Sequence, residues 1–182
     1  DLAMLEDLGR RLTQTFEQRL RTNGVGELSD DTGFSAGVCP VEMCVVAKRT
    51  AFSAQQDALA IFGPGLNKLS IGLAAGSTAL AFARDEAGSA TATTGGSWSV
   101  GETRIVSGVF RRDDNRDLFC DGSSVGQSTV TRVTASATKL AIMGTAGNDT
   151  RIKAAMIYAE DLGSSGRDAN AVVLAARFGI TL

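Results

Sequence analysis

Hydrophobic positions change their spacing once along the chain, from a helical period to short or alternating runs. From residue 2 to about residue 22 an apolar side chain returns every three or four positions, which predicts an amphipathic helix ending at Asn23-Gly24. Its apolar stripe requires a partner surface, either the sheet of its own domain or another chain. The stripe opens at Leu2, and the residues expected to tether or oligomerise the chain are Leu5, Leu8, Leu12, Phe16 and Leu20.

The second half of the pattern predicts an antiparallel β-sandwich. Residues 24–37 are polar and glycine-rich, which is typical of a connector, and residues 85–96 have the composition of turns. From residue 38 onward, short apolar runs are separated by Gly, Asn, Asp and Ser, with no helix predicted between them. This pattern argues against a doubly wound α/β fold. The predicted strands are 41–48, 58–62, 68–73, 78–84, 102–111, 117–121, 128–134, 139–143 and 151–158.

Two further features, a tight turn and a C-terminal helix, complete the predicted fold. Asp121-Gly122 favours a tight turn with positive φ at the end of a hairpin over residues 104–121. Residues 167 to about 177 predict a second helix that ends at Gly179. The side chains expected to face the sandwich from this helix are Ala171, Leu174, Ala175 and Phe178.

Length and composition fit one globular domain and exclude several kinds of site. The 182 residues carry 18 basic and 20 acidic side chains, a net charge of −2 that argues against a nucleic-acid partner. The chain has no histidine, which removes Ser-His-Asp and Cys-His catalysis and histidine-based zinc sites. The longest apolar run, residues 38–47, is too short to span a membrane and contains Pro40 and Glu42.

The three cysteines predict free thiols and assembly in a reducing compartment. Cys39 and Cys44 lack CxxC spacing, and the set with Cys120 is odd in number. Cys44 and Cys120 lie in apolar runs and are expected to be small buried hydrophobic residues. The first residues are acidic and amphipathic, so no secretory signal is expected.

Residues 44 to 182 resemble the laminin G-like, concanavalin A-like lectin/glucanase jelly roll, in the version found in phage and bacterial surface proteins. Four pieces carry the resemblance: Cys44-Val-Val-Ala-Lys48 followed by Ala60-Ile-Phe-Gly63, Leu118-Phe-Cys-Asp-Gly122 with Val125-Gly126 after it, Leu140-Ala-Ile-Met-Gly144, and Ile152 to Tyr158 followed by Leu162. The tail Leu174-Ala-Ala-Arg-Phe-Gly-Ile-Thr-Leu182 also resembles the ending often seen in this group. The resemblance implies an all-β antiparallel jelly roll over residues 38–182. Residues 1–23 and 24–37 fall outside it, as a helical tether and a connector.

Glucanases of this superfamily carry two carboxylates on one strand, in a pattern close to Glu-x-Asp-x-x-Glu. No such pattern occurs here, and Glu102, Glu160 and Asp161 lack a partner at that spacing. We therefore expect a protein without enzymatic activity.

Family members often hold calcium through loop carboxylates, for which the weak candidates here are Asp113, Asp117 and Asp149. We favour solvated turn residues instead, and no cofactor, because Ala154 and Ala159 stand where relatives carry acidic residues.

Candidate ligand-binding residues are few because the chain has one Trp and one Tyr. Sugar-binding modules stack an exposed aromatic ring on the sugar and orient hydroxyl groups with polar side chains. The weak candidates are Trp98, Asp114 and Arg116. We favour a different role for Trp98, as a core anchor that opens a strand.

These observations predict a structural or binding module, displayed by a phage or phage-like virion as a head decoration, head fibre or tail fibre. Its expected partners are other virion proteins, copies of itself and cell-surface glycans, after assembly in the host cytoplasm. The alternative is a secreted carbohydrate-binding module, and an active glycoside hydrolase is remote.

Overall fold

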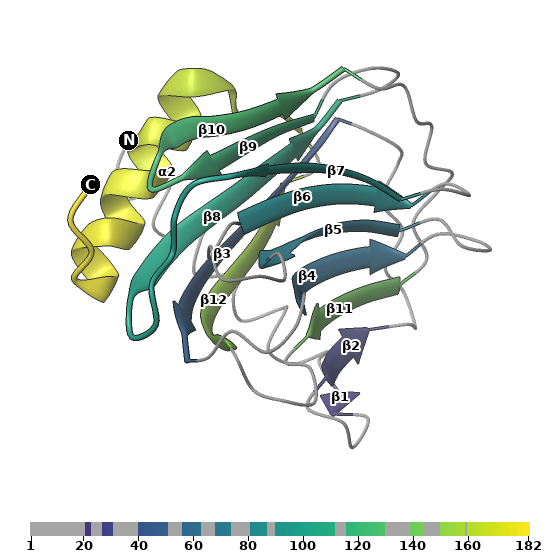
Figure 1. The fold of residues 1–182 in the computed structure, drawn as a ribbon, viewed down its shortest axis with the longest axis horizontal. Coiled ribbons are helices and arrows are strands. Elements are labelled where there is room, and N and C mark those ends of the chain that lie inside the picture. The colour runs from purple at the N-terminus through teal and green to yellow at the C-terminus, as the bar shows by residue number, and fades with distance from the viewer. Residues whose placement is uncertain are drawn as a thin grey trace.

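Two antiparallel sheets face each other, and one helix packs on the outside of the smaller sheet (Figure 1). The computed structural model describes residues 21–22, 27–30, 40–50, 56–62, 68–73, 81–86, 90–111, 116–129, 139–143, 150–158 and 160–182. The larger sheet has the order β1-β2-β11-β4-β5-β6-β7 and the smaller one β10-β9-β8-β3-β12. This arrangement confirms the predicted antiparallel β-sandwich.

The elements have the following bounds. The seven-stranded sheet consists of β1 (Arg21–Thr22), β2 (Glu27–Asp30), β4 (Gln56–Phe62), β5 (Lys68–Leu73), β6 (Ala81–Glu86), β7 (Ala90–Gly95) and β11 (Lys139–Met143). The five-stranded sheet consists of β3 (Val41–Arg49), β8 (Thr103–Phe110), β9 (Arg116–Cys120), β10 (Ser123–Ser128) and β12 (Thr150–Tyr158), and the helix is α2 (Gly163–Phe178).

Strand β3, inside the five-stranded sheet, is buried on both faces, which explains its apolar run over residues 43–47. Alternate residues of a strand point to opposite faces, so Met43 and Val45 enter the core between the sheets, whereas Cys44 and Val46 point outward. The outward residues meet α2 in a second core. Its buried members are Cys44, Val46, Ile105, Ala171, Leu174 and Ala175, and Phe178 packs against them. The predicted sandwich-facing side of the second helix is thus confirmed.

Helix α2 begins four residues before the predicted start and ends as predicted. Gly179 has φ 66° and donates its backbone N–H to the carbonyl oxygen of Ala175. At the other end, the backbone N–H of Gly163 donates to Asp161 Oδ1 at 3.0 Å. The Gly163–Gly166 turn has weak helix propensity, so the apolar period alone placed the start at Arg167. Over the described residues, no helix combines the length and hydropathy needed to cross a membrane.

Several expectations about the N-terminal half are corrected by the sheet topology. Residues 21–22 form β1 rather than the end of a helix, and the 24–37 connector contains β2, which pairs with β11. The sandwich therefore includes residues 21–22 and 27–30. The remainder of the predicted helix, residues 2–20, lies outside the described residues.

Two further strands, β7 and β10, were missed because they are built from small or polar residues. β7, within the expected turn-rich segment 85–96, alternates Ala and Thr, which have little hydrophobicity to signal a strand. β10 is an edge strand of polar composition, and its side chains are exposed or half-buried. The predicted strand 128–134 therefore meets β10 only at Ser128, and residues 130–134 lie outside the described residues.

The end of β7 approaches β10 so closely that only glycine fits at position 95. A Cβ atom on Gly95 would lie 2.0 Å from the carbonyl oxygen of Val125. We expect Gly95→Ala to lower the free energy of unfolding by about 1–3 kcal/mol, because one of the two backbones must shift. Urea denaturation measures the loss. The neighbouring exposed Ser97→Ala should leave the midpoint unchanged, and an equal effect of both variants would contradict the close approach.

Candidate functional site

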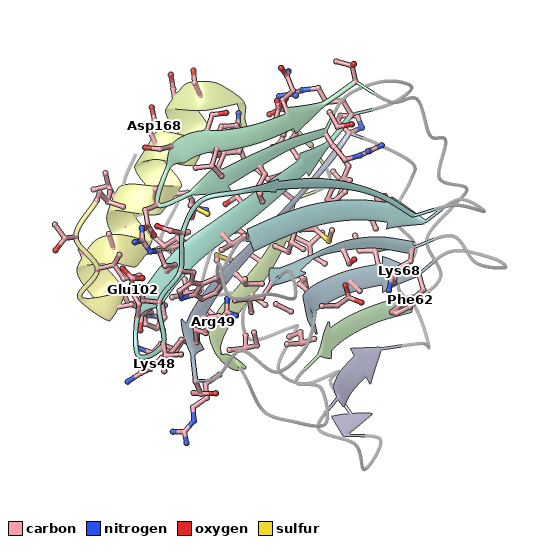
Figure 2. All side chains as sticks on the ribbon, viewed as in Figure 1. Lys48, Arg49, Phe62, Lys68, Glu102 and Asp168 are labelled. Atoms are coloured by element: carbon pink, nitrogen blue, oxygen red, sulfur yellow. The ribbon has the colours of Figure 1, made fainter. Side chains whose placement is uncertain are left out.

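A polar cluster lies on the outer face of the seven-stranded sheet, where β4 and β5 run side by side. Leu69 and Ile71 of β5 fill the core between the sheets, so Lys68 and Ser70 lie on the opposite, outer face. Phe62 pairs with Lys68 in register and shares this face. Figure 2 shows Phe62 and Lys68 together at one end of β4 and β5. The alternation of β5 thus gathers its polar side chains on one surface.

Lys68 is held along this surface by Asp57. Lys68 Nζ lies 2.7 Å from Asp57 Oδ2 and 5.9 Å from the centroid of the Phe62 ring. In the register of the two strands, the pair Ala60 and Ser70 lies between Lys68 and Asp57, so the lysine side chain extends over it. The ion pair is largely shielded, with side-chain exposures of 15% for Lys68 and 13% for Asp57.

Two polar atoms of this cluster have no hydrogen-bond partner. They are Asp57 Oδ1 and the hydroxyl oxygen of Ser70, and both are buried. A buried polar atom without a partner costs about 1–3 kcal/mol. The strand pairing shifts between Asp57 and Leu59, and such a bulge redirects the side chain beside it.

The members of this group, which we call the outer-face cluster, are Asp57, Phe62, Lys68 and Ser70. Its four side chains lie on adjoining strands and differ in chemistry. The carboxylate accepts hydrogen bonds, the hydroxyl can donate or accept them, the ammonium group donates them, and the fourth side chain is an aromatic ring. Both atoms that lack partners are buried, and Ser70 is fully buried, so bound hydroxyl groups could reach them only if the groups that cover them moved. This chemistry suits a ligand with many hydroxyl groups.

A second polar group, the helix anchor, fastens α2 to the five-stranded sheet. Glu42 of β3 is fully buried, and its Oε2 accepts from Arg167 Nη1 at 2.7 Å and from the backbone N–H of Leu162 at 3.3 Å. Arg167 also donates to Asp161 Oδ1 at 3.0 Å, and its guanidinium lies 4.3 Å from the centroid of the Phe119 ring. The contacts of Arg167 thus join β3, β9 and the start of α2.

Further charges extend the helix anchor toward the hairpin between β8 and β9. Arg111 donates from Nε to Asp161 Oδ2 at 2.7 Å and from Nη1 to Asp117. Burial raises the pKa of Glu42, although the charge of Arg167 opposes the rise. Burial also acts to raise the pKa of Asp161, but the N–H of Gly163 and the two arginines lower it below its ordinary value. The anchor's arginines are engaged within the fold, so we interpret it as structural.

The lowered pKa of Asp161 predicts a specific loss of stability in acid. A carboxylate whose pKa is lower in the folded state stabilises the protein above its unfolded-state pKa, and this contribution disappears as the pH falls through the folded-state pKa. Below about pH 4 the difference in unfolding free energy between the wild type and Asp161→Asn should therefore shrink from about 1 kcal/mol toward zero. Thermal unfolding from pH 7 to pH 2 measures it, and a difference independent of pH would contradict the assignment.

Trp98 is a core residue and not a sugar-stacking platform. It is 2% exposed, and its indole N–H donates to the backbone oxygen of Glu102 at 3.0 Å. The Glu102 carboxylate accepts from the backbone N–H of Ser99 at 2.9 Å and pairs with Arg104 at 2.6 Å. The candidate ligand-binding role of Trp98 is thus corrected, because no ring face reaches the surface, and the favoured role as a core anchor is confirmed.

The predicted tight turn at Asp121-Gly122 is confirmed, with φ values of 50° and 83°. The Asp121 carboxylate holds the turn against β8, since it accepts from the backbone N–H of Ile105 at 2.8 Å and from Arg104 Nη1 at 2.7 Å.

The remaining predicted site residues do not converge within the described residues. Arg116 is 3% exposed, which corrects its candidate ligand role, and Asp117 already accepts from Arg111. In the described part of the chain, no three Cys, Asp or Glu side chains come together as a metal site. Outside the described residues lie Asp113, Asp114 and Asp149, together with the stripe residues Leu5, Leu8, Leu12, Phe16 and Leu20.

Cys44 and Cys120 are free and buried, as the sequence predicts. Burial raises the pKa of each thiol to about 12, so neither forms an appreciable amount of reactive thiolate near neutral pH. Cys39 lies outside the described residues.

Comparison with solved structures identifies the sandwich as a jelly roll. The heptameric SAP-like pentraxin of Limulus polyphemus matches with a TM-score of 0.61 and 12% identity, over 83% of this chain and 78% of that chain. The binding domain of botulinum neurotoxin serotype G matches with a TM-score of 0.62 and 8% identity, over 82% of this chain and 41% of that chain. At such identities the likeness establishes the fold, and the predicted fold class is confirmed.

A third structure belongs to botulinum neurotoxin type C, whose cell entry depends on interaction with two ganglioside molecules. It matches with a TM-score of 0.62 and 9% identity over 85% of this chain, which spans only 41% of the neurotoxin chain. No protein-family model matches the sequence, and no curated protein matches it. The narrower resemblance to laminin G-like domains of phage stays a prediction.

Sequence reasoning missed the outer-face cluster because its members lie in or beside predicted strands. A usable signal was present in residues 68–73, where polar or small residues alternate with Leu69, Ile71 and Leu73. That alternation places Lys68 and Ser70 on one face. The pairing with Asp57 depends on the register of β4 against β5, which the sequence does not display.

Proposed function

We propose that this protein is a non-enzymatic, lectin-like module that binds a glycan on the outer face of its seven-stranded sheet. The observation that carries the proposal is the outer-face cluster, in which Asp57 Oδ1 and the Ser70 hydroxyl lack partners and the Phe62 ring lies beside Lys68 Nζ. The hydroxyl groups of a carbohydrate can hydrogen-bond to these two atoms, and the apolar face of a sugar ring can pack on Phe62.

The absence of enzymatic activity is part of this proposal. The full sequence contains no histidine and no Glu-x-Asp-x-x-Glu pattern, so the paired-carboxylate arrangement of the related glucanases is missing. The ganglioside interaction of the type C neurotoxin supports glycan binding on this fold. The heptameric state of the pentraxin supports assembly of several copies.

A glycan array probed with the intact chain tests the proposal. Binding to one or more glycans is expected, and Asp57→Asn should weaken it about tenfold, which corresponds to about 1.4 kcal/mol of binding free energy. The matched control is Asp168→Asn, because Asp168 is an exposed carboxylate on α2, on the other side of the molecule from Lys68 in Figure 2. A blank array, or equal weakening by both variants, would overturn the proposal.

We further propose that a phage or phage-like virion displays the module, as a head decoration, head fibre or tail fibre assembled in the host cytoplasm. The supporting observation is that Cys44 and Cys120 are free and unreactive, as suits a protein folded in a reducing compartment. Capsid and tail genes beside the gene are the expected finding. A cleavable secretion signal in the full-length gene would favour the secreted alternative instead.

A further inference from the structure

Three cations lie together at one end of the five-stranded sheet, on the neighbouring strands β3 and β12. Lys48 and Arg151 are directly paired in register, and Lys153 follows at a point where the pairing of β12 shifts by one residue. Arg151 and Lys153 are exposed, and Lys48 is half-buried. The register places the side chains of Lys48 and Arg151 within about 5.5 Å of each other at Cβ.

In the described part of the chain, no acidic side chain neutralises this group. Among the described residues, none forms an ion pair or hydrogen bond with the side chain of Lys48, Arg151 or Lys153. Glu102, which Figure 2 shows in the same region as Lys48, is already occupied by Arg104 and the backbone of Ser99. Like charges opposed across a strand pair destabilise a sheet, so the pair has a cost that an anionic ligand would remove.

The location keeps this group open to a ligand. Farther along the same strands, the outward side chains Val46, Ala154 and Met156 are covered by α2. Lys48 follows the covered part of β3 and Arg151 precedes that of β12, so both lie toward the same end of the sheet, and neither belongs to the core beneath the helix. β12 is also the last strand of this sheet among the described residues.

We propose that Lys48, Arg151 and Lys153 form a binding strip for an acidic polysaccharide. The strip lies on the other sheet from the outer-face cluster and does not depend on it. Two exposed cations on β12, beside a half-buried lysine on β3, suit the carboxylate or sulfate groups of an extended polymer. Three cations are fewer than the four to eight that make a lipid-binding polybasic segment. Among the residues that the structure describes, none of the three adjoins an exposed aromatic residue on which bases could stack.

Binding of the full chain to four soluble polymers tests the strip: alginate, dextran sulfate, uncharged dextran and single-stranded DNA. Binding to alginate or dextran sulfate that falls with added salt is expected, with no binding to dextran. Lys48→Gln combined with Arg151→Gln should weaken that binding about tenfold or more. The matched control is Ser164→Glu with Ser165→Glu, which changes the net charge equally at exposed positions of α2.

A stability measurement excludes misfolding as the cause of lost binding. Arg151→Glu places an opposite charge beside Lys48, so it should raise the midpoint of thermal unfolding while it weakens polysaccharide binding. The proposal is overturned if neither acidic polymer binds, if dextran binds equally, or if the DNA binds more tightly than both polysaccharides. It also fails if the control pair of variants weakens binding as much as the glutamine pair, because the effect would then belong to net charge.

Discussion

Arg167→Met lowers the free energy of unfolding by about 3–5 kcal/mol, the largest effect that we expect from a single charged residue here. The substitution leaves the Glu42 carboxylate fully buried without its 2.7 Å partner. It also removes the contact of the guanidinium with Asp161 and with the Phe119 ring. Since these contacts join α2 to β3 and β9, chemical denaturation should show the loss as a lower midpoint.

A double variant separates the loss of a partner from the loss of packing. Glu42→Leu combined with Arg167→Met removes both charges, and we expect it to recover most of the stability that the single variant loses. Arg177→Met, at an exposed position in the last turn of the same helix, should change the unfolding free energy by no more than about 0.5 kcal/mol. Equal losses in the single and double variants would show that burial of unpaired charge is not the cause.

Trp98→Ala lowers the free energy of unfolding by a similar amount, about 3–5 kcal/mol, because it leaves a cavity in the core between the sheets. It also leaves the backbone oxygen of Glu102 without the indole N–H. Calorimetry or far-ultraviolet circular dichroism measures the loss, since the variant has no tryptophan fluorescence.

The comparison with Trp98→Phe distinguishes packing from hydrogen bonding. Phenylalanine keeps most of the buried ring and loses the donor, so its cost should be smaller, about 1–2 kcal/mol. Should Trp98→Ala weaken glycan binding while the unfolding midpoint stays unchanged, Trp98 would be a surface platform, contrary to its buried position.

Strand alternation and turn chemistry made much of the sandwich predictable. β5 and β11 have the predicted bounds. The ends of β3, β8 and β12 lie within one residue of the predicted ends. These strands carry apolar residues that the core requires, and burial leaves a pattern in the sequence. β7 and β10 were missed because Ala, Thr and Ser fit an edge position without such a pattern.

The candidate site was less predictable because it depends on pairing between strands. Asp57 and Lys68 are eleven positions apart and meet through the register of β4 with β5. Glu42 and Arg167 are 125 positions apart. An isolated charge in an apolar run, such as Glu42 between Val41 and Met43, indicates a buried polar contact but does not identify the partner.

The two outer surfaces of the sandwich have different roles in this account. The five-stranded sheet carries α2 on its outward face, and the strip of Lys48, Arg151 and Lys153 lies at one end of that sheet. The seven-stranded sheet carries the outer-face cluster, and we assign glycan binding to that surface.

The most direct test of the central claim is hydrogen exchange of the protein, measured with and without a glycan found on the array. We predict that added glycan slows exchange in β4 and β5, leaves α2 and β12 unchanged, and is recovered intact after incubation. Slowed exchange confined to α2 and the five-stranded sheet, or recovery of cleaved glycan, would contradict a non-enzymatic lectin-like module that binds through its seven-stranded sheet.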